Sequence, residues 1–426
     1  MDGTLLPRHL RGEITNALAS ARVVNIIGPR QVGKTTLVRD LFGGRGRFVT
    51  LDDTGILAAI EADPYGQLTA LVAQAGDGPV IIDEAQRSRH IPLAIKRIID
   101  EQRRMGQFLL TGSSNIFTSA HVADSLAGRV QTLTLLPLSA AEIHRKGPAR
   151  FLDWASQEPS LATLPQAPPA GRAECLDLIV RGGYPEISRQ SDRLRNRRYR
   201  DAIDSIVDRD VADVLQVRKT DSLRRLMDQL AARTANELVI DDLCSVVGVQ
   251  RPTLEHYLDA LTGLSVVKRL GSWASGAAKR EVKRPKIHLV DTGVVSALRR
   301  FTASSFGLDG TPTALGPILE TYVHNEIDKI LPYQGLEWRL WHWRNQDGRE
   351  VDILAENDRS LVAIEVKAAV TLNSGDLKNL RWFRSDGPGK GRDVTGIIFH
   401  LGDQPLSFGD AIFGLPLSMF WAWDDH

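Results

Sequence analysis

The sequence predicts a multidomain α/β protein that begins with a doubly wound parallel sheet. Short apolar runs such as VVNII, FVTL, PVIID and QFLLTG are typical of buried parallel strands. Amphipathic segments such as PLAIKRIIDEQRR separate these runs and have the spacing of crossover helices. The chain of 426 residues also exceeds what one hydrophobic core usually serves, so we expect about two or three domains.

The composition is that of an ordinary globular chain. Hydrophobic residues make up 42% and charged residues 25%, which excludes global disorder. The formal net charge of +1 gives no whole-molecule attraction to nucleic acid or an anionic membrane, so DNA would have to bind through local patches. Two basic runs are candidates, from Arg193 to Arg200 and from Lys279 to Lys286, although most such runs are solvated faces.

Cysteine usage and the amino terminus predict a cytoplasmic location. Cys175 and Cys244 are far apart in the sequence, which favours a reducing compartment over a disulfide framework. The first residues lack the features of a signal peptide, and no apolar run approaches the length of a membrane-spanning helix. We therefore expect a soluble protein that does not enter a membrane.

Changes in composition along the chain predict several regions. The parallel-sheet domain covers residues 1–146, and a stretch rich in Pro, Ala and Ser at 147–172 is typical of a linker or surface excursion. A helical lid region at 173–217 opens with the sequence GGYPE. Residues 276–426 mix strands and helices and are expected to form a separate α/β domain.

Residues 218–275 have the pattern of a winged helix-turn-helix. Two short amphipathic segments flank a turn at Gly248, and an apolar strand, VVKRL, follows them. Thr253 is a candidate amino-terminal cap for the second helix. Such a module could bind DNA or dock a protein, and the pattern leaves both possibilities open.

The motif GPRQVGKT follows the first apolar strand and opens a helix, as expected of a phosphate-binding loop. Glycines allow main-chain N–H groups to surround phosphates, and the helix amino terminus adds partial positive charge. Lys34 would reach the β- and γ-phosphates of ATP, and the Thr35 hydroxyl would ligate Mg²⁺. A chance glycine turn is the alternative. The predicted nucleotide-binding residues of this loop are Gly28, Pro29, Arg30, Gln31, Val32, Gly33, Lys34, Thr35 and Thr36.

The run PVIIDE predicts the second part of the same site. Its apolar strand ends in Asp83, which would hold the Mg²⁺ shell. The next residue, Glu84, would act as general base toward the attacking water. A helix cap after a strand is the alternative interpretation of these two carboxylates.

More polar residues follow the next predicted strand, QFLLTG. Ser113, Ser114 and Asn115 would reach the carboxyl-terminal edge of the sheet, where the phosphates are expected to lie. We assign Ser114 and Asn115 to the nucleotide site, although a turn-and-cap role is equally open for each residue. Arg129 is a candidate arginine finger in cis or in trans, and a structural ion pair is its alternative.

Two predicted strands in the last third of the chain, within VDILAE and SLVAIEVKAA, flank the polar turn ENDRS and would form a hairpin. Side chains two apart on a strand share a face. Glu365 and Lys367 would therefore lie on one face, with Val362, Ile364 and Val366 on the other, buried face.

The charged residues of this hairpin would suit a metal-dependent nuclease site. If Asp352 lies beside Glu365, the two carboxylates could bind Mg²⁺ or Mn²⁺, and Glu320 on the preceding helix could complete the set. Lys367 would then position or activate a hydroxide for phosphodiester cleavage. A surface salt-bridge face is the alternative. Three histidines lack clear ligand spacing and are expected to be structural: His288, His324 and His342.

Taken together, these motifs resemble a family of bacterial and archaeal ATP-binding proteins with an AAA-type (AAA+) ATPase domain and a carboxyl-terminal domain of poorly defined function. GPRQVGKTTL, IIDEAQR, LTGSSN, SLAGRV, GGYPE, ETYVHNEI, WRNQDGREVDIL and IEVKAA carry the resemblance, which covers nearly the whole chain. It implies a helix-turn-helix and a restriction-endonuclease-like PD-(D/E)xK domain, in which Glu320, Asp352, Glu365 and Lys367 have the roles given above. Residues 147–172 look like an insertion relative to this pattern.

The leading hypothesis is an Mg²⁺-dependent ATPase that couples ATP binding and hydrolysis to DNA binding and to DNA cleavage by the nuclease-like domain. The competing hypothesis is a nucleotide-dependent switch that binds protein partners and cuts nothing, because Glu365 and Lys367 could pair only with each other. A homo-oligomer is compatible with both hypotheses, since Arg129 acting in trans would require a neighbouring chain.

Overall fold

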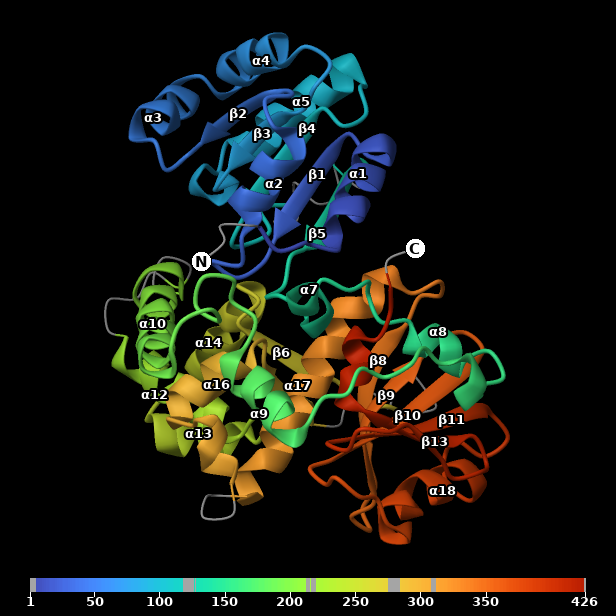
Figure 1. Cartoon of the computed structure of the whole chain (residues 1–426). Coiled ribbons are helices and arrows are strands. Elements are labelled where there is room, and N and C mark those ends of the chain that lie inside the picture. Colours follow the sequence, from blue (N-terminus) through green and yellow to red (C-terminus); the bar gives the residue numbers. More distant parts are fainter. Residues whose placement is uncertain are drawn as a thin grey trace. The chain divides into compact units, whose positions relative to one another are not determined.

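The computed structural model describes residues 5–117, 126, 128–211, 215, 220–274, 284–307 and 312–424. They form two compact units (Figure 1). The smaller unit consists mainly of Arg8–Pro137, and the larger mainly of Leu138–Thr262 and Val266–His426. No helix within the described ranges is long and apolar enough to cross a membrane. Most of the basic run that starts at Lys279 lies outside these ranges.

The smaller unit is built on a five-stranded parallel sheet, which confirms the fold class predicted for this part of the chain. Its strands, in the spatial order β2-β3-β4-β1-β5, are β1 (Val23–Ile27), β2 (Arg47–Thr50), β3 (Val80–Asp83), β4 (Phe108–Gly112) and β5 (Val130–Thr134). Its α-helices are α1 (Leu10–Ser20), α2 (Lys34–Phe42), α3 (Thr54–Ala62), α4 (Pro64–Ala75) and α5 (Ile91–Gln102).

The sheet order places a ligand site at the carboxyl end of β1. From β1 the chain forms β2, β3 and β4 on one side of that strand and then crosses to β5 on the other side. Ligands of open α/β sheets bind where the strand order reverses in this way. β4 lies between β1 and β3, so polar residues that follow β4 lie between the loop after β1 and the loop after β3.

The first half of the larger unit is mainly helical (Figure 1). Its α-helices are α7 (Ala140–His144), α8 (Phe151–Ala155), α9 (Arg172–Arg181), α10 (Asp192–Ser205), α12 (Asp221–Ala232), α13 (Ile240–Val247), α14 (Arg251–Gly263) and α16 (Thr292–Arg299). A π-helical segment, η3 (Ile206–Val211), continues α10. The strands β6 (Val267–Leu270) and β7 (Lys286–Leu289) pair antiparallel.

We predicted a linker or surface excursion at 147–172. This prediction is wrong for α8, because α8 packs into the core of the larger unit. The ring of Phe151 lies 5.3 Å from that of Phe399, and the ring of Trp154 lies 5.0 Å from that of Phe413. Thr395 also donates a hydrogen bond of 2.8 Å to the carbonyl oxygen of Ala155. Two buried aromatic side chains thus tie α8 to the carboxyl-terminal sheet, although Pro and Ala are the commonest residues of the stretch 147–172.

The helices on either side of Gly248 form as predicted. Gly248 ends α13 in the left-handed conformation, with φ of 76°, which glycine adopts without a steric penalty. α14 begins at Arg251, so Thr253 lies inside the helix and the prediction that it caps this helix is wrong. Whether α13, α14 and the β6–β7 pair act as a winged helix-turn-helix stays a prediction.

The carboxyl-terminal sheet has six strands in the order β12-β13-β11-β10-β9-β8. β8, β9 and β10 are antiparallel, whereas β10, β11 and β13 are parallel. The strands are β8 (Arg339–Arg344), β9 (Glu350–Glu356), β10 (Ser360–Lys367), β11 (Asp393–His400), β12 (Leu406–Ser407) and β13 (Ile412–Pro416). Two α-helices belong to this part, α17 (Leu315–Ile330) and α18 (Lys378–Ser385). Short 3₁₀ helices in the chain are η1 (Ala85–Arg87), η2 (Leu161–Thr163), η4 (Ala303–Phe306), η5 (Pro312–Ala314), η6 (Leu331–Tyr333), η7 (Ser374–Leu377) and η8 (Leu417–Trp421).

The hairpin of β9 and β10 forms as predicted, but β10 is buried on both faces. Leu361 and Ala363 are as buried as Val362 and Ile364, and Glu365 is only 1% exposed. The prediction of a single buried face is therefore wrong. A strand that is covered on both faces typically has a continuous apolar sequence. A buried carboxylate within such a strand needs hydrogen-bond or charge partners.

The GGYPE sequence has a structural role in the larger unit. The Gly183 N–H donates a hydrogen bond of 2.7 Å to Asp291, which also accepts from the N–H of Gly293 at the start of α16. A Cβ atom on Gly182 would lie 2.2 Å from the Asp291 carboxylate, and one on Gly293 would lie 2.5 Å from the Tyr199 ring. Close packing of α9, α10 and α16 thus requires glycine at both positions.

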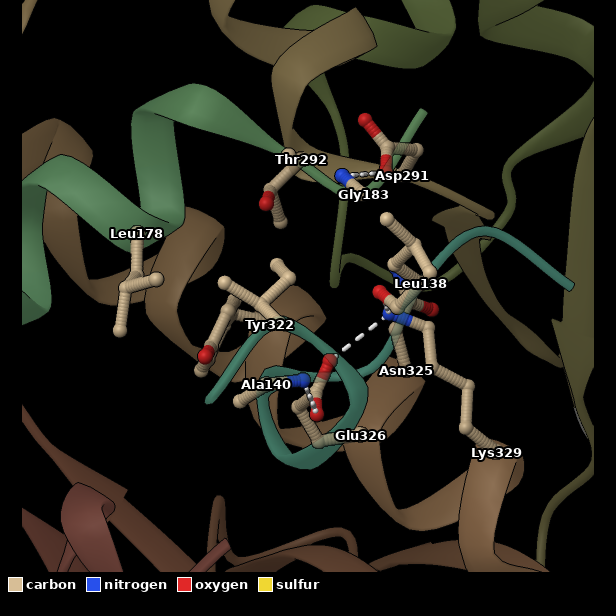
Figure 2. A pocket seen from close by; sticks show the side chains of 12 residues that line it. Leu138, Ala140, Leu178, Gly183, Asp291, Thr292, Tyr322, Asn325, Glu326 and Lys329 are labelled. Atoms are coloured by element: carbon tan, nitrogen blue, oxygen red, sulfur yellow. Dashed lines mark hydrogen bonds and ion pairs between the residues drawn. The ribbon is translucent and has the colours of Figure 1, made fainter. Parts of the chain in front are cut away.

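Hydrogen bonds hold the segment 138–140 beside Gly183 and Asp291 (Figure 2). Leu138 donates to the carbonyl oxygen of Gly183 at 2.7 Å and accepts from Lys329 Nζ at 3.0 Å. The Ala140 N–H donates to Glu326 at 2.8 Å. The pocket that these residues line has a volume of about 10 Å³, room for about one water molecule, so it does not suit a nucleotide or another small-molecule substrate.

Two stacked histidines lie buried between β7 and α17. The ring centroids of His288 and His324 are 4.1 Å apart and the rings are nearly parallel, with an interplanar angle of 4°. Thr321 contacts His288 Nδ1 at 3.1 Å. Burial lowers the pKa of both rings below the ordinary value of 6.5, and their mutual repulsion lowers that of His288 further. Both are therefore neutral in the folded protein.

The histidine pair predicts acid sensitivity of the larger unit. Below about pH 6.5 the unfolded chain binds protons that the folded chain excludes, so the free energy of unfolding falls as pH decreases. Each such histidine contributes a slope of about 1.4 kcal/mol per pH unit. His288→Phe keeps a stacked ring and should reduce the slope by about that amount.

Tryptophan fluorescence during urea unfolding between pH 5 and pH 7 measures this slope. All eight tryptophans lie after residue 153, so the signal reports on the larger unit. A variant with the wild-type slope would contradict this account of the pair.

Candidate nucleotide site and buried charge cluster

The phosphate loop lies between β1 and α2, at the expected edge of the sheet. Gly28 has φ of 147°, and a Cβ atom there would lie 2.1 Å from the carbonyl oxygen of Leu135. Gly33 precedes α2 with φ of 93°. Both positions therefore require glycine. Pro29 and Val32 are buried, whereas Gln31 and Thr36 are exposed and Arg30 is half-buried.

The Lys34 side chain is buried against the phosphate loop that precedes it. Its Nζ donates to the carbonyl oxygens of Gly28 at 2.8 Å and Pro29 at 2.7 Å. The ammonium group is thus held close to the place where the loop would receive phosphate oxygens. Arg8, which sequence reasoning missed, donates to the carbonyl oxygens of Val32 at 2.7 Å and Leu136 at 2.5 Å and ties the loop to the segment after β5.

Thr35 and Asp83 meet at the carboxyl edge of the sheet. The Thr35 hydroxyl donates to the Asp83 carboxylate at 2.9 and 3.1 Å. Thr111 on β4 also donates to Asp83, and Thr50 lies 3.5 Å from it. Hydroxyl and carboxylate oxygens are the ligands that Mg²⁺ prefers, so this pair fits the predicted metal position. Sequence reasoning missed Thr50 and Thr111, because only the sheet order brings them to Asp83.

Glu84 and the residues after β4 form a polar group beside this pair. Glu84 has a left-handed backbone, with φ of 57°, and its carboxylate accepts from Gln86 Nε2 at 2.6 Å. The same amide nitrogen lies 3.3 Å from Ser113 Oγ. Asn115 accepts a hydrogen bond of 3.1 Å from Asn25 on β1. Ser114 is half-buried nearby in the sequence.

Arg129 lies at the opposite edge of the sheet. It precedes β5, whose residue Val130 is in register with Val23 at the start of β1, whereas the phosphate loop follows Ile27 at the end of β1. A strand rises about 3.3 Å per residue, so roughly 13 Å separates the two edges. Arg129 pairs with Asp100 instead. The structure therefore does not bring Arg129 to the phosphate loop of its own chain, as a finger in cis would require.

A second group of charges lies in the larger unit, between β7, α17 and the β9–β10 hairpin. Lys286 Nζ lies 2.7 Å from Glu320 Oε1 and 3.7 Å from Asp352 Oδ1. Lys367 Nζ lies 2.6 Å from Glu365 Oε2, and the N–H of Val366 donates to Asp352 at 2.9 Å. The predicted residues Glu320, Asp352, Glu365 and Lys367 thus come together, with Lys286 as an additional member that no motif indicated.

Burial controls the protonation of this cluster. Burial, together with the charge of Asp352, raises the pKa of Glu365 to about 8 and raises the pKa of Glu320 well above its ordinary value. Burial alone would lower the pKa of Lys286, but the Glu320 and Asp352 carboxylates outweigh it and raise this pKa. The lysine therefore stays an ammonium ion.

The cluster does not fit a divalent cation as it stands. Buried Glu365 Oε1 has no hydrogen-bond partner among the described residues, which would suit a metal ligand. The Lys286 ammonium group, however, lies beside the oxygens of Glu320 and Asp352. Across the part of the chain that the structure describes, no group of three or more His, Cys, Asp and Glu side chains has the arrangement of a metal site.

The sheet order, the phosphate loop and the contact between Thr35 and Asp83 define the smaller unit as a P-loop nucleotide-binding domain. Comparison with known proteins agrees, because residues 20–144 match the family described as AAA domain. The smaller unit is therefore an AAA-type ATP-binding domain. Residues 172–305 and 315–420 match two families that are each described as a domain of unknown function, DUF8612 and DUF4143.

Two uncharacterized mycobacterial proteins are similar to most of the chain. Rv2008c of Mycobacterium tuberculosis and Mb2031c of Mycobacterium bovis are each 28% identical over 366 residues, which cover 85% of this chain and 74% of the relative. Among solved structures, the Walker-type ATPase PABY2304 of Pyrococcus abyssi matches 69% of this chain and 96% of its own, with 16% identity and a TM-score of 0.44. None of these names assigns an activity to the larger unit.

Proposed function

We propose that the protein hydrolyses ATP in the presence of Mg²⁺. The observation that carries this proposal is the contact of the Thr35 hydroxyl with the Asp83 carboxylate directly beside the phosphate loop. Mg²⁺, when bound, would neutralise charge on the β- and γ-phosphates. Thr35 and Asp83 would hold the ion, loop N–H groups would bind phosphate oxygens, and Lys34 would turn from the loop carbonyls toward the phosphates.

Glu84 is the proposed general base for the attacking water. Gln86 Nε2 donates a hydrogen bond of 2.6 Å to the Glu84 carboxylate. This bond keeps the base in one orientation beside the loop after β4. Asn115, tied to Asn25, is the proposed residue that orients the water or the γ-phosphate. Arg129 enters this scheme only in trans, from a neighbouring chain.

Phosphate release during incubation with ATP tests the proposal. Wild-type protein should release phosphate from ATP in the presence of Mg²⁺. Phosphate release should stop when EDTA removes the metal. A preparation with native circular dichroism that releases no phosphate at any Mg²⁺ concentration would refute it.

For the larger unit, the geometry favours a nucleotide-dependent switch over a nuclease. The supporting observation is that Lys367 pairs with Glu365 at 2.6 Å, while Lys286 pairs with Glu320 at 2.7 Å. Lysines that pair with the proposed metal ligands are not available to activate a hydroxide. We therefore propose that nucleotide state controls binding of a partner and that the protein does not cut DNA.

DNA is the partner that the exposed arginines of α10 favour. Arg193, Arg197 and Arg198 are exposed on this helix, as is Arg200, which also donates to the carbonyl oxygen of Ala297. Arg195, in contrast, is buried against Asp192 and is not available to a phosphate. Replacing Arg193, Arg197 and Arg198 by glutamine should weaken DNA binding. It should also reduce the slope of log affinity against log salt by about 0.9 for each phosphate that the protein no longer neutralises.

Fluorescence anisotropy of labelled duplex DNA over a salt series measures this effect. Arg359→Gln, in the exposed turn between β9 and β10, controls for the loss of a positive charge elsewhere. An unchanged salt slope in the triple variant would favour a protein partner instead of DNA.

A further inference from the structure

Lys286 lies inside the charge cluster, next to two of its carboxylates. Only 5% of its side chain is exposed, and its ammonium group lies 2.7 Å from Glu320 Oε1 and 3.7 Å from Asp352 Oδ1. Mg²⁺ and Mn²⁺ prefer carboxylate oxygens of this kind. A divalent ion bound to both oxygens would have to lie next to the ammonium group, where two positive charges repel each other strongly in a buried environment.

The main chain holds Lys286 in this position from two sides. Within the β6–β7 pair it lies opposite Leu270, and an isolated β-bridge joins it to Glu237. The Cα atom of Lys286 is therefore part of a paired strand, and its side chain is directed into the cluster by that strand. Withdrawal of the ammonium group would require either a change of rotamer within a packed interior or movement of β7.

Without Lys286, the cluster would have too few donors for its oxygens. Glu365 Oε1 has no partner among the described residues even now, and Lys367 accounts only for Oε2. Removing the ammonium group would leave oxygens of Glu320 and Asp352 without their positive partner. Buried carboxylates without a partner are costly, and a divalent ion is a partner that can contact several carboxylates at once.

We propose that Lys286 takes the place of a divalent cation in the cluster of Glu320, Asp352 and Glu365. The wild-type cluster then binds neither Mg²⁺ nor Mn²⁺, and a metal site forms only when this lysine is removed or displaced. This inference goes beyond ATP hydrolysis at the phosphate loop and does not depend on it. It gives the larger unit a latent metal site whose occupancy is controlled by one side chain.

Mn²⁺ binding to the nucleotide-free full-length chain tests this proposal. Electron paramagnetic resonance of the free ion measures how much Mn²⁺ the protein takes up. Every protein in the comparison carries Asp83→Asn, so that the phosphate loop does not contribute. Lys286→Met, which keeps an unbranched side chain one atom shorter and without the charge, should bind Mn²⁺ with a dissociation constant at least about tenfold lower than that of the parent.

Adding Asp352→Asn to the Lys286→Met protein should abolish the gain, because it removes one of the proposed ligands. Lys286→Gln is a second uncharged variant, in case the methionine variant does not fold, and should show the same gain. Two results would overturn the proposal. One is Mn²⁺ binding by the parent that Asp352→Asn removes; the other is a folded Lys286 variant that binds no more Mn²⁺ than the parent.

Discussion

Lys34→Ala is expected to remove Mg²⁺-dependent ATP hydrolysis, with a fall in kcat of at least about a hundredfold. Lys34 is the buried ammonium group of the phosphate loop, and its Nζ already lies 2.8 Å from the carbonyl oxygen of Gly28. Alanine removes the positive charge that would offset negative charge on the β- and γ-phosphates. The loss of this charge should also lower ATP affinity, because the ammonium group would contact the bound phosphates.

The matched control is Lys96→Ala on α5, because Lys96 is the other lysine of the smaller unit. This variant loses the same charge from the same unit and should keep its turnover. Initial rates of phosphate release for the three proteins decide the outcome. Turnover by Lys34→Ala close to the wild-type rate would rule out the proposed role of the loop.

Glu84→Gln is expected to lower kcat by about 100- to 10,000-fold while ATP binding is preserved. Glutamine keeps the shape of the side chain but cannot accept the proton of the attacking water. Glu84 lies next to Asp83 but is held by Gln86, so its replacement should leave the contact between Thr35 and Asp83 intact. The variant should therefore bind ATP with Mg²⁺ and fail to hydrolyse it.

Separate measurements of binding and turnover distinguish this result from that of Lys34→Ala. Fluorescent-nucleotide titration gives the affinity, and single-turnover hydrolysis gives the chemical step. Gln86→Ala should have an intermediate effect on the chemical step, because it removes the side chain that orients Glu84. Wild-type turnover by Glu84→Gln would show that another group takes the proton.

Local patterns predicted the strand and the helix on either side of the phosphate loop. β1, the phosphate loop and α2 follow one another directly in the chain, so spacing and residue type are sufficient to place Gly28, Lys34 and Thr35. The same holds for Asp83 at the end of an apolar strand. The β9–β10 hairpin was predictable for a similar reason, because a polar turn separates its two strands.

Residues that depend on tertiary neighbours were not predictable in the same way. Thr111 reaches Asp83 only because β4 lies beside β3, and Lys286 reaches Glu320 across 34 positions of sequence. Arg129 illustrates the same limit. Its sequence context suits an arginine finger, but the register of β5 with β1 places it at the wrong edge of the sheet for a role in cis.

Within residues 147–172, composition misled the prediction for α8, whereas most of residues 156–169 lie at the surface. Proline and alanine are the commonest residues of this stretch, and such segments are often exposed. Phe151 and Trp154 nevertheless insert into an aromatic group of the carboxyl-terminal sheet. A few large apolar side chains outweigh the average composition, because burial of an aromatic ring is worth several kcal/mol, on the order of 3.

The binding of ATP to the wild-type protein, measured by isothermal titration calorimetry with and without Mg²⁺, tests the central claim most directly. The phosphate loop, Lys34 and the pair of Thr35 and Asp83 predict uptake of about one ATP per chain, stronger with Mg²⁺ than without it and lost in Lys34→Ala. Folded wild-type protein that takes up no ATP in the presence of Mg²⁺ would contradict the account.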